Sequence, residues 1–346
     1  MSACRPLADN GSKRNLRWNP GMLQSLRADE THGLDPKAKR VIAALSSNSP
    51  FREVPPGIAR DAYRNARKPY LWPLDDVASI EDLDTRGAAP SMLLFRPIEN
   101  RARGLPATYL FLHGGGWTVG DIASYEPLCR RLCNLLNANI IWVDYRLAPE
   151  HSFPAPLDDT LAASRWIFAN AFRLGINPAR IGIMGDSAGA NLAAAAALFN
   201  IDGNLGEKFV AQILIYPCLD LTRQHPSHTE FAEGFLLTRE LYAWYVSNYL
   251  GHHDARDAHV SPLFATDISG LAPAVILHAG FDPLRDEAIA YAAKLRRAKV
   301  PVKEIAFTDM IHGFINMGAV LPQAEDAVLC VRSALHTLLA NRISQK

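Results

Sequence analysis

Short apolar runs alternate with longer amphipathic stretches from about residue 75 to the end of the chain. The runs are rich in Val, Ile and Leu, a pattern typical of strands that are buried on both faces of a parallel sheet. The strands predicted from these runs are residues 77–83, 92–95, 107–112, 139–144, 180–184, 210–216, 274–279 and 302–307. The helices predicted between them are residues 125–136, 157–174, 188–200, 285–298 and 323–341. This alternation predicts an α/β fold with a mostly parallel central sheet flanked by helices.

Two regions break the alternation. Residues 21–70 contain short amphipathic patterns, and in the clearest of them Asp35 occupies an N-cap position before Pro36, followed by apolar residues at helical spacing. Residues 238–250 form a second helical pattern that is rich in aromatic side chains. The predicted organisation is an N-terminal helical segment (1–74), an α/β domain in two parts (75–217 and 261–346), and an insertion (218–260) that packs near the N-terminal helices.

Charge and composition exclude several classes of protein. The chain has 346 residues, of which 49% are hydrophobic, and its 36 basic and 35 acidic residues leave a net charge of +1. Such a balance does not suit nucleic acid or an anionic membrane surface as a partner. Met1 to Gly21 lacks the apolar core of a signal peptide, and no apolar run reaches the roughly 18 residues of a membrane span. The five cysteines include no CxxC pair, and we expect a reduced, cytoplasmic protein.

One strand leads directly into a Gly-x-Ser-x-Gly motif. Ile181 to Met184 is apolar, Gly185-Asp-Ser-Ala-Gly189 follows, and an alanine-rich helix begins next. A serine on so sharp a strand-to-helix turn needs neighbours without side chains two positions before and after it, which explains the two glycines. The turn lifts the Ser187 hydroxyl above the sheet and directs the first amides of the helix at the same point. The motif predicts that Ser187 is a nucleophile.

A glycine-rich loop, His113-Gly-Gly-Gly-Trp117, follows the predicted strand 107–112. Consecutive glycines let the backbone approach a ligand closely and present N–H groups to it. An enzyme of acyl transfer needs such donors for the oxyanion of its tetrahedral intermediate. A phosphate-binding loop is the alternative, but neither the Lys-Ser/Thr of a P-loop nor a GxGxxG pattern is present.

A serine nucleophile needs a histidine base and an acid that orients it. His312 lies after the predicted strand 302–307, whereas His336 lies on a helix and His278 lies within an apolar strand. Asp282 follows the strand 274–279 at an N-cap position, and Asp286 and Glu287 are competitors inside the following helix. Ser187, Asp282 and His312 are therefore the predicted catalytic residues. Their order along the chain is that of the α/β-hydrolase triad.

With these motifs in place, the chain resembles the bacterial hormone-sensitive-lipase-like esterases, family IV of the carboxylesterases, in their GDSAG branch. The resemblance runs from about Gly21 onward and rests on HGGG at 113–116, DYRLAPE at 144–150, GDSAG at 185–189, EGFLLT at 233–238, DPLRDE at 282–287 and HGF at 312–314. It implies an α/β-hydrolase fold with a helical cap made by the N-terminal helices and the insertion. It also implies an oxyanion hole formed by the backbone amides of Gly115, Gly116 and Ala188. Ala190 stands where many members have a further glycine.

The resemblance implies a serine carboxylesterase, of the EC 3.1.1 class, that acts on short to medium acyl chains. We expect Trp117, Tyr216 and Phe231 to line the substrate pocket, a small ester as the substrate, and no cofactor. A metal site at His252, His253, Asp254, Asp257 and His259 is disfavoured because the loop lacks the spacing of rigid ligands. The formation of a homodimer stays an open alternative. Two other functions stay open as well: an amide-type hydrolase such as an arylformamidase or arylacetamide deacetylase, and a non-catalytic small-molecule receptor on the same fold.

Overall fold

The computed structural model describes residues 33–46, 54–98 and 105–343. The predictions made for Met1 to Gly21 and for Cys4 lie outside these ranges. Eight strands are assigned within them: β1 (Ser79–Asp82), β2 (Met92–Arg96), β3 (Thr108–Leu112), β4 (Asn139–Val143), β5 (Ile181–Asp186), β6 (Gln212–Ile215), β7 (Ala274–Phe281) and β8 (Val302–Ile311). The helices are α1 (Pro36–Ser46), α2 (Pro56–Arg67), α3 (Ile122–Leu136), α4 (Ala155–Asn170), α5 (Ala188–Phe199), α6 (Ser227–Glu230), α7 (Arg239–Leu250), α8 (Arg285–Arg297) and α9 (Gln323–Ile343).

The strands form one sheet in the order β1-β2-β4-β3-β5-β6-β7-β8. β2 pairs antiparallel with both β1 and β4, and every pair from β4 to β8 is parallel. The prediction of an α/β fold with a mostly parallel sheet is therefore confirmed. The parallel strands all end at one edge of the sheet, so the loops that follow them meet there.

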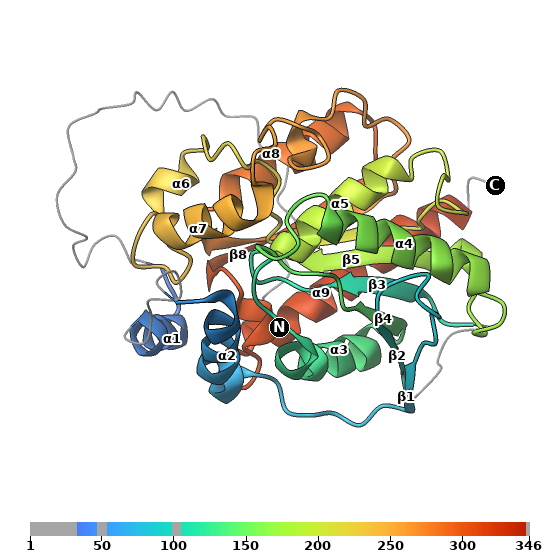
Figure 1. Ribbon diagram of the computed structural model, residues 1–346, viewed down its shortest axis with the longest axis horizontal. Helices are drawn as coiled ribbons and strands as arrows, with labels where there is room; N and C mark the ends of the chain where they lie inside the picture. Colours follow the sequence, from blue (N-terminus) through green and yellow to red (C-terminus); the bar gives the residue numbers. More distant parts are fainter. Residues whose placement is uncertain (1–32, 47–53, 99–104, 344–346) are drawn as a thin grey trace.

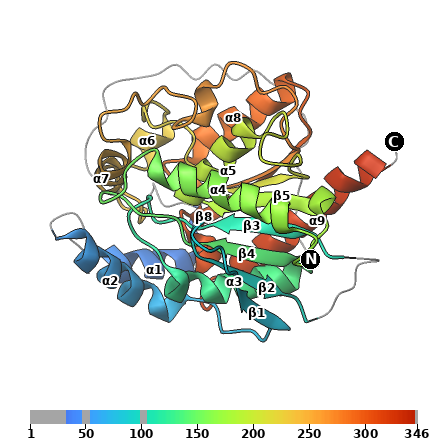
Figure 2. The ribbon, with the colours of Figure 1, turned by 45° about the vertical axis from the view of Figure 1, so that its right-hand side comes forward.

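Two hydrophobic cores lie on opposite faces of the sheet, because successive side chains of a strand alternate between its faces. Leu110 and Leu112 of β3 pack into one core with α4, α5 and α8, whereas Tyr109 and Phe111 pack into the other with α3 and α9. Figure 2 shows these two helical layers above and below the sheet. Continuous burial on both faces explains the nearly unbroken apolar runs in the sequence.

Beyond the carboxyl edge of the sheet, α1 and α2 lie on the same side of the molecule as α6 and α7 (Figure 1). α1 begins as the sequence predicts, with the Asp35 carboxylate accepting hydrogen bonds from the amides of Lys37 and Ala38. None of the helices in the described ranges combines the length and apolar character that crossing a membrane requires.

Three strands run further toward this edge than the apolar runs predict. β5 ends at Asp186, β7 at Phe281 and β8 at Ile311, because the sheet pairing continues after the apolar run has ended. The extension matters for function. It places Ser187, Asp282 and His312 directly at the ends of their strands.

Candidate active site

The Ser187 turn has the strained geometry that the Gly-x-Ser-x-Gly motif predicts. Ser187 has φ 56° and ψ −119°, outside the regions that residues with a side chain usually adopt. A Cβ built on Gly185 would lie 2.3 Å from the carbonyl carbon of Gly189, and one on Gly189 would lie 1.9 Å from the oxygen of Leu112. Neither position can hold a side chain. Both glycines are therefore needed for α5 to start so close to the sheet.

Ser187, His312 and Asp282 form a hydrogen-bonded chain across three strand ends. The Ser187 Oγ lies 2.8 Å from His312 Nε2, and His312 Nδ1 lies 2.7 Å from Asp282 Oδ2. The Asp282 carboxylate has no exposed surface, and its other oxygen accepts a hydrogen bond from the Leu284 amide. Tyr216 packs against the His312 ring with a centroid distance of 4.7 Å. The imidazole is thus held between an acid and a hydroxyl group.

Asp282 is not the N-cap of α8, contrary to the sequence prediction. The helix starts at Arg285 with Leu284 in the cap position, because Pro283 and Leu284 form an extra turn before it. Of the competitors, Asp286 accepts a hydrogen bond from the Ser227 amide and pairs with Arg285. These contacts direct Asp286 away from His312.

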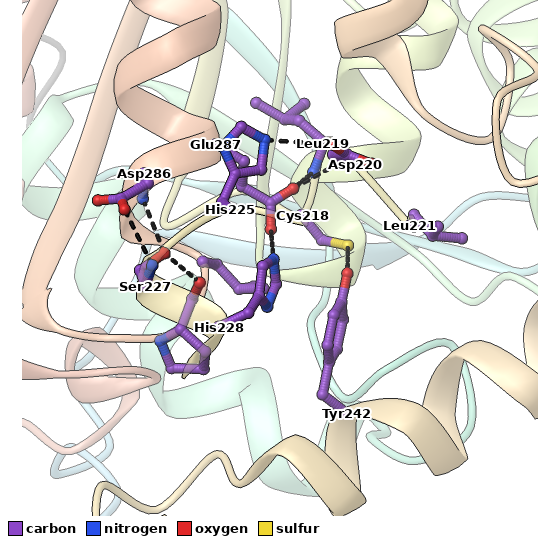
Figure 3. Close-up of polar contacts among 12 residues, drawn as sticks. Cys218, Leu219, Asp220, Leu221, His225, Ser227, His228, Tyr242, Asp286 and Glu287 are labelled. Atoms are coloured by element: carbon purple, nitrogen blue, oxygen red, sulfur yellow. Dashed lines mark hydrogen bonds and ion pairs between the residues drawn. The ribbon is translucent and has the colours of Figure 1, made fainter. Parts of the chain in front are cut away.

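Glu287, the other competitor, belongs to a separate buried cluster beside the site (Figure 3). Its carboxylate accepts hydrogen bonds from the amides of Leu219 and Asp220 and lies 3.5 Å from His228 Nε2. Burial raises the pKa of Glu287, while the nearby His228 ring and the two amides oppose this shift. The cluster fastens α8 to the loop after β6. Cys218, the residue before Leu219 in this loop, lies in the wall of the cavity described below.

The glycine loop after β3 is held in place by Asp186. Its carboxylate is buried and accepts hydrogen bonds from the Gly114 amide (2.7 Å) and from the hydroxyl groups of Tyr125 and Tyr216 (3.2 Å each). A Cβ on Gly116 would lie 2.0 Å from the Tyr245 ring, so only glycine fits there. Within the described residues, the amides of Gly115, Gly116 and Ala188 donate no turn or loop hydrogen bond to the backbone. All three are therefore available to a ligand.

Asp186 is expected to make the stability of the protein depend on pH. Burial raises the pKa of its carboxyl group to about 6, above the value of about 4 in an unfolded chain. The folded state thus holds this proton more tightly than the unfolded state does. The protonated carboxyl group stabilises the fold fully at low pH, and this stabilisation is lost as the pH rises through about 6. We expect the unfolding free energy of wild type minus that of Asp186→Asn to fall by up to about 3 kcal/mol between pH 4 and pH 7. Urea unfolding across that range measures it, and a constant difference would contradict the assignment.

His113, the first residue of the glycine loop, is a buried structural histidine. Its ring stacks between Trp142 and Tyr145, and Nδ1 lies 2.6 Å from the Gly114 oxygen. Burial lowers the pKa of His113 to about 4, so the ring is neutral at pH 7. His278 is likewise buried and lies 3.2 Å from Glu304, whereas His336 is exposed on α9.

A cavity of about 290 Å³ opens beside Ser187 and His312. Its wall includes Trp117, as expected, but not Tyr216 or Phe231. The Tyr216 hydroxyl group binds Asp186 and its ring packs against His312, whereas Phe231 packs against Phe235 and Phe281. The remaining wall comes from the N-terminal helices, the insertion and the loops after the strands: Leu45, Tyr63, Ala66, Arg67, Gly115, Gly116, Tyr125, Asp186, Ala188, Cys218, Leu236, Leu237, Thr238, Glu240, Leu241, Tyr242, Tyr245, Leu284, Gly313 and Asn316.

Sequence reasoning missed most of this wall. Arg67 and Tyr245 lie on helices whose apolar spacing predicts packing only, and no local motif marks either residue. The aromatic-rich pattern of 238–250 is the one available signal, since Tyr242 and Tyr245 face the cavity from it. Across the described part of the chain, no three His, Cys, Asp or Glu side chains gather in a way that could hold a metal ion.

The family comparison agrees with this geometry. A family model described as the alpha/beta hydrolase fold matches residues 109–316, which include the glycine loop and all three residues of the hydrogen-bonded chain. The protein belongs to the α/β-hydrolase superfamily. Within it, the chain is a member of the hormone-sensitive-lipase-like carboxylesterases of family IV.

Similar proteins are known from several sources. The chain is 42% identical over 214 residues to the carboxylic ester hydrolase LipN of Mycobacterium tuberculosis, covering 60% of this chain and 57% of LipN. It is 35% identical over 266 residues to the ethyl acetate hydrolase of Pseudomonas putida, covering 75% of this chain and 82% of that enzyme. A solved ester hydrolase from the metagenome of Lake Arreo, complexed with a bipyridine phosphonate derivative, superposes with a TM-score of 0.81 at 36% identity. That match covers 89% of this chain and 99% of the other.

Proposed function

We propose that the protein is a serine carboxylesterase that hydrolyses short to medium acyl esters through an acyl-enzyme. The observation that carries the proposal is the hydrogen-bonded chain from Ser187 through His312 to Asp282 at the wall of the cavity. The curated relatives named as carboxylic ester hydrolase and ethyl acetate hydrolase support ester hydrolysis as the reaction.

In this mechanism His312 Nε2 takes the proton of the Ser187 hydroxyl as Oγ attacks the ester carbonyl carbon. The amides of Gly115, Gly116 and Ala188 donate to the oxyanion that forms. Nε2 then returns the proton to the leaving alcohol, and the acyl group stays on Ser187. A water molecule then attacks the acyl carbonyl carbon while His312 Nε2 takes its proton. Nε2 returns that proton to Ser187 Oγ as the carboxylic acid leaves. Asp282 keeps the imidazole in the required tautomer and stabilises its protonated form.

The size of the cavity supports short to medium acyl chains. Its volume of about 290 Å³ lies near the lower end, about 300 Å³, of small-molecule sites in proteins. We infer that the described residues of 1–74, together with 218–260, act as the cap that limits this volume, since Leu45, Tyr63, Leu236 and Tyr245 come from these segments and line the cavity.

The two alternative functions differ from this one in their chemistry. A receptor on the same fold needs no base beside the serine, and the contact of 2.8 Å between His312 and Ser187 argues against it. An amide-type hydrolase would use the same residues, so substrates rather than geometry separate it from an esterase.

We expect p-nitrophenyl acetate and butyrate to be hydrolysed with kcat/KM values about tenfold or more above that of the laurate ester, because a small cavity is expected to enclose short acyl chains better than long ones. The measurement is the rate of p-nitrophenol release from esters of increasing acyl length, with p-nitroacetanilide as the amide. A higher kcat/KM for the anilide would favour the amidase. A maximum at laurate would contradict the proposed chain length.

A further inference from the structure

Helix α2 has three arginines that lie one turn apart, and two of them fasten the helix to the rest of the protein. Arg60 pairs with Glu150 and donates hydrogen bonds to the carbonyl oxygens of Thr118 and Ala148. Arg64 pairs with Asp121 and with Asp61. Arg60 and Arg64 therefore attach the helix to the rest of the protein, and the third arginine, Arg67, takes no part in these contacts.

Arg67 has no carboxylate partner among the described residues. Its recorded contact is a cation–π interaction with Tyr63, at 5.1 Å from the guanidinium carbon to the ring centroid. The side chain is half-buried and lies in the wall of the cavity. A positive charge that is partly removed from water and left without an anion is unfavourable, and an anionic ligand would relieve this.

The position of the guanidinium group within the cavity can be stated from Gly313. A Cβ built on Gly313 would lie 3.4 Å from Arg67 Nη1 and 4.0 Å from Nη2. Gly313 directly follows His312, and all three residues line the cavity, so the guanidinium group lies in the part of the wall that contains the base. In the proposed reaction His312 gives its proton to the leaving alcohol, and the leaving group therefore lies on this side of Ser187.

The other charged groups in the cavity wall are Asp186 and Glu240. Asp186 is occupied by the Gly114 amide and by two tyrosine hydroxyl groups. Glu240 is an exposed residue of α7, with interactions of its own. Much of the remaining wall is aliphatic or aromatic, and charge-assisted hydrogen bonds are stronger in such surroundings than in water.

We propose that Arg67 is a specificity-determining residue that binds a carboxylate on the alcohol part of the ester, an inference that rests on the proposed esterase function. The substrates favoured are esters in which a hydroxy acid or hydroxybenzoate is the leaving group. The planar guanidinium group presents parallel N–H donors that match the two oxygens of a carboxylate.

The test compares 4-acetoxybenzoate with its uncharged analogue phenyl acetate in wild type, Arg67→Gln and Arg67→Lys. The quantity is the ratio of the two kcat/KM values, since intrinsic differences between the phenols cancel when this ratio is compared among variants. Arg67→Gln is expected to lower the ratio about tenfold, because a neutral amide replaces the two charge-assisted donors, and Arg67→Lys to lower it less. Lys68→Gln is the matched control, because it removes the same charge from the next, exposed residue outside the cavity. It should leave the ratio unchanged.

A binding measurement separates this inference from the proposed function. Calorimetry of Ser187→Ala should show tighter binding of benzoate than of benzamide, with the preference lost in Ser187→Ala/Arg67→Gln. If wild type hydrolyses neither ester while this benzoate preference holds, the esterase proposal fails and the anion site stands. If both esters are hydrolysed, and Arg67→Gln changes neither the ratio nor the benzoate preference, the role of Arg67 is overturned.

Discussion

Ser187→Ala is expected to lower kcat for p-nitrophenyl acetate by about 10⁴- to 10⁶-fold, since Ser187 Oγ carries the acyl group in the proposed mechanism. Ser187 is the hydroxyl group in contact with His312 Nε2, and the turn that presents it is fixed by Gly185 and Gly189. Alanine keeps the backbone of the turn and removes only Oγ. The measurement is steady-state hydrolysis together with labelling by a fluorophosphonate, which should disappear in the variant.

Two controls test whether the loss of activity comes from misfolding or from the loss of any buried hydroxyl group. The thermal unfolding of Ser187→Ala should resemble that of wild type, because one oxygen is lost from a site that already faces a cavity. Ser164→Ala removes a buried hydroxyl group that binds the Thr160 carbonyl on α4, a helix with no residue in the cavity wall, and should keep wild-type turnover. Activity retained by Ser187→Ala would end the acyl-enzyme proposal.

Asp282→Asn is expected to lower kcat by about 10⁴-fold with little change in KM, as in triads where the orienting acid is replaced by its amide. The Asp282 carboxylate accepts from His312 Nδ1 at 2.7 Å. An amide can instead donate to Nδ1, which leaves the imidazole proton on Nε2. A protonated Nε2 cannot accept the proton of Ser187. The loss therefore falls on the chemical step rather than on substrate binding.

The matched control is Asp286→Asn, four residues later on α8. Asp286 binds the Ser227 amide and Arg285, so its replacement is expected to alter the attachment of α6 and to change kcat less than tenfold. Both variants should be compared by kcat, KM and thermal unfolding. A larger loss in Asp286→Asn than in Asp282→Asn would move the role of the acid to Asp286.

The experiments on Ser187 and Asp282 concern residues that the sequence singles out. The experiment on Arg67 concerns a residue that the sequence does not single out. The glycine spacing around Ser187 has a local steric cause, and it can be recognised wherever a strand runs into such a turn. The choice of His312 from eleven histidines depended on its place after a strand. Arg67 has no comparable mark, because an arginine near the end of an amphipathic helix usually faces solvent.

The acid shows where local reasoning reaches its limit. Asp282, Asp286 and Glu287 lie within six residues, and the sequence favours Asp282 because it follows a strand, although Leu284 occupies the N-cap position also expected for Asp282. The packing of α8 against the loop after β6 shows what the other two carboxylates bind instead. It directs Glu287 to the amides of Leu219 and Asp220, and Asp286 to Ser227.

The sequence alone predicts the α/β class, the mostly parallel sheet, the strained serine turn and the chain order of the three site residues. These features follow from periodicity and from steric limits within a few residues, which act before any distant contact forms. Only the tertiary structure shows how far β5, β7 and β8 extend, what Asp286 and Glu287 bind, and which side chains enclose the cavity. Those outcomes depend on segments hundreds of residues apart meeting at one edge of the sheet. Such meetings are set by the pairing and packing of the whole molecule and not by any local pattern.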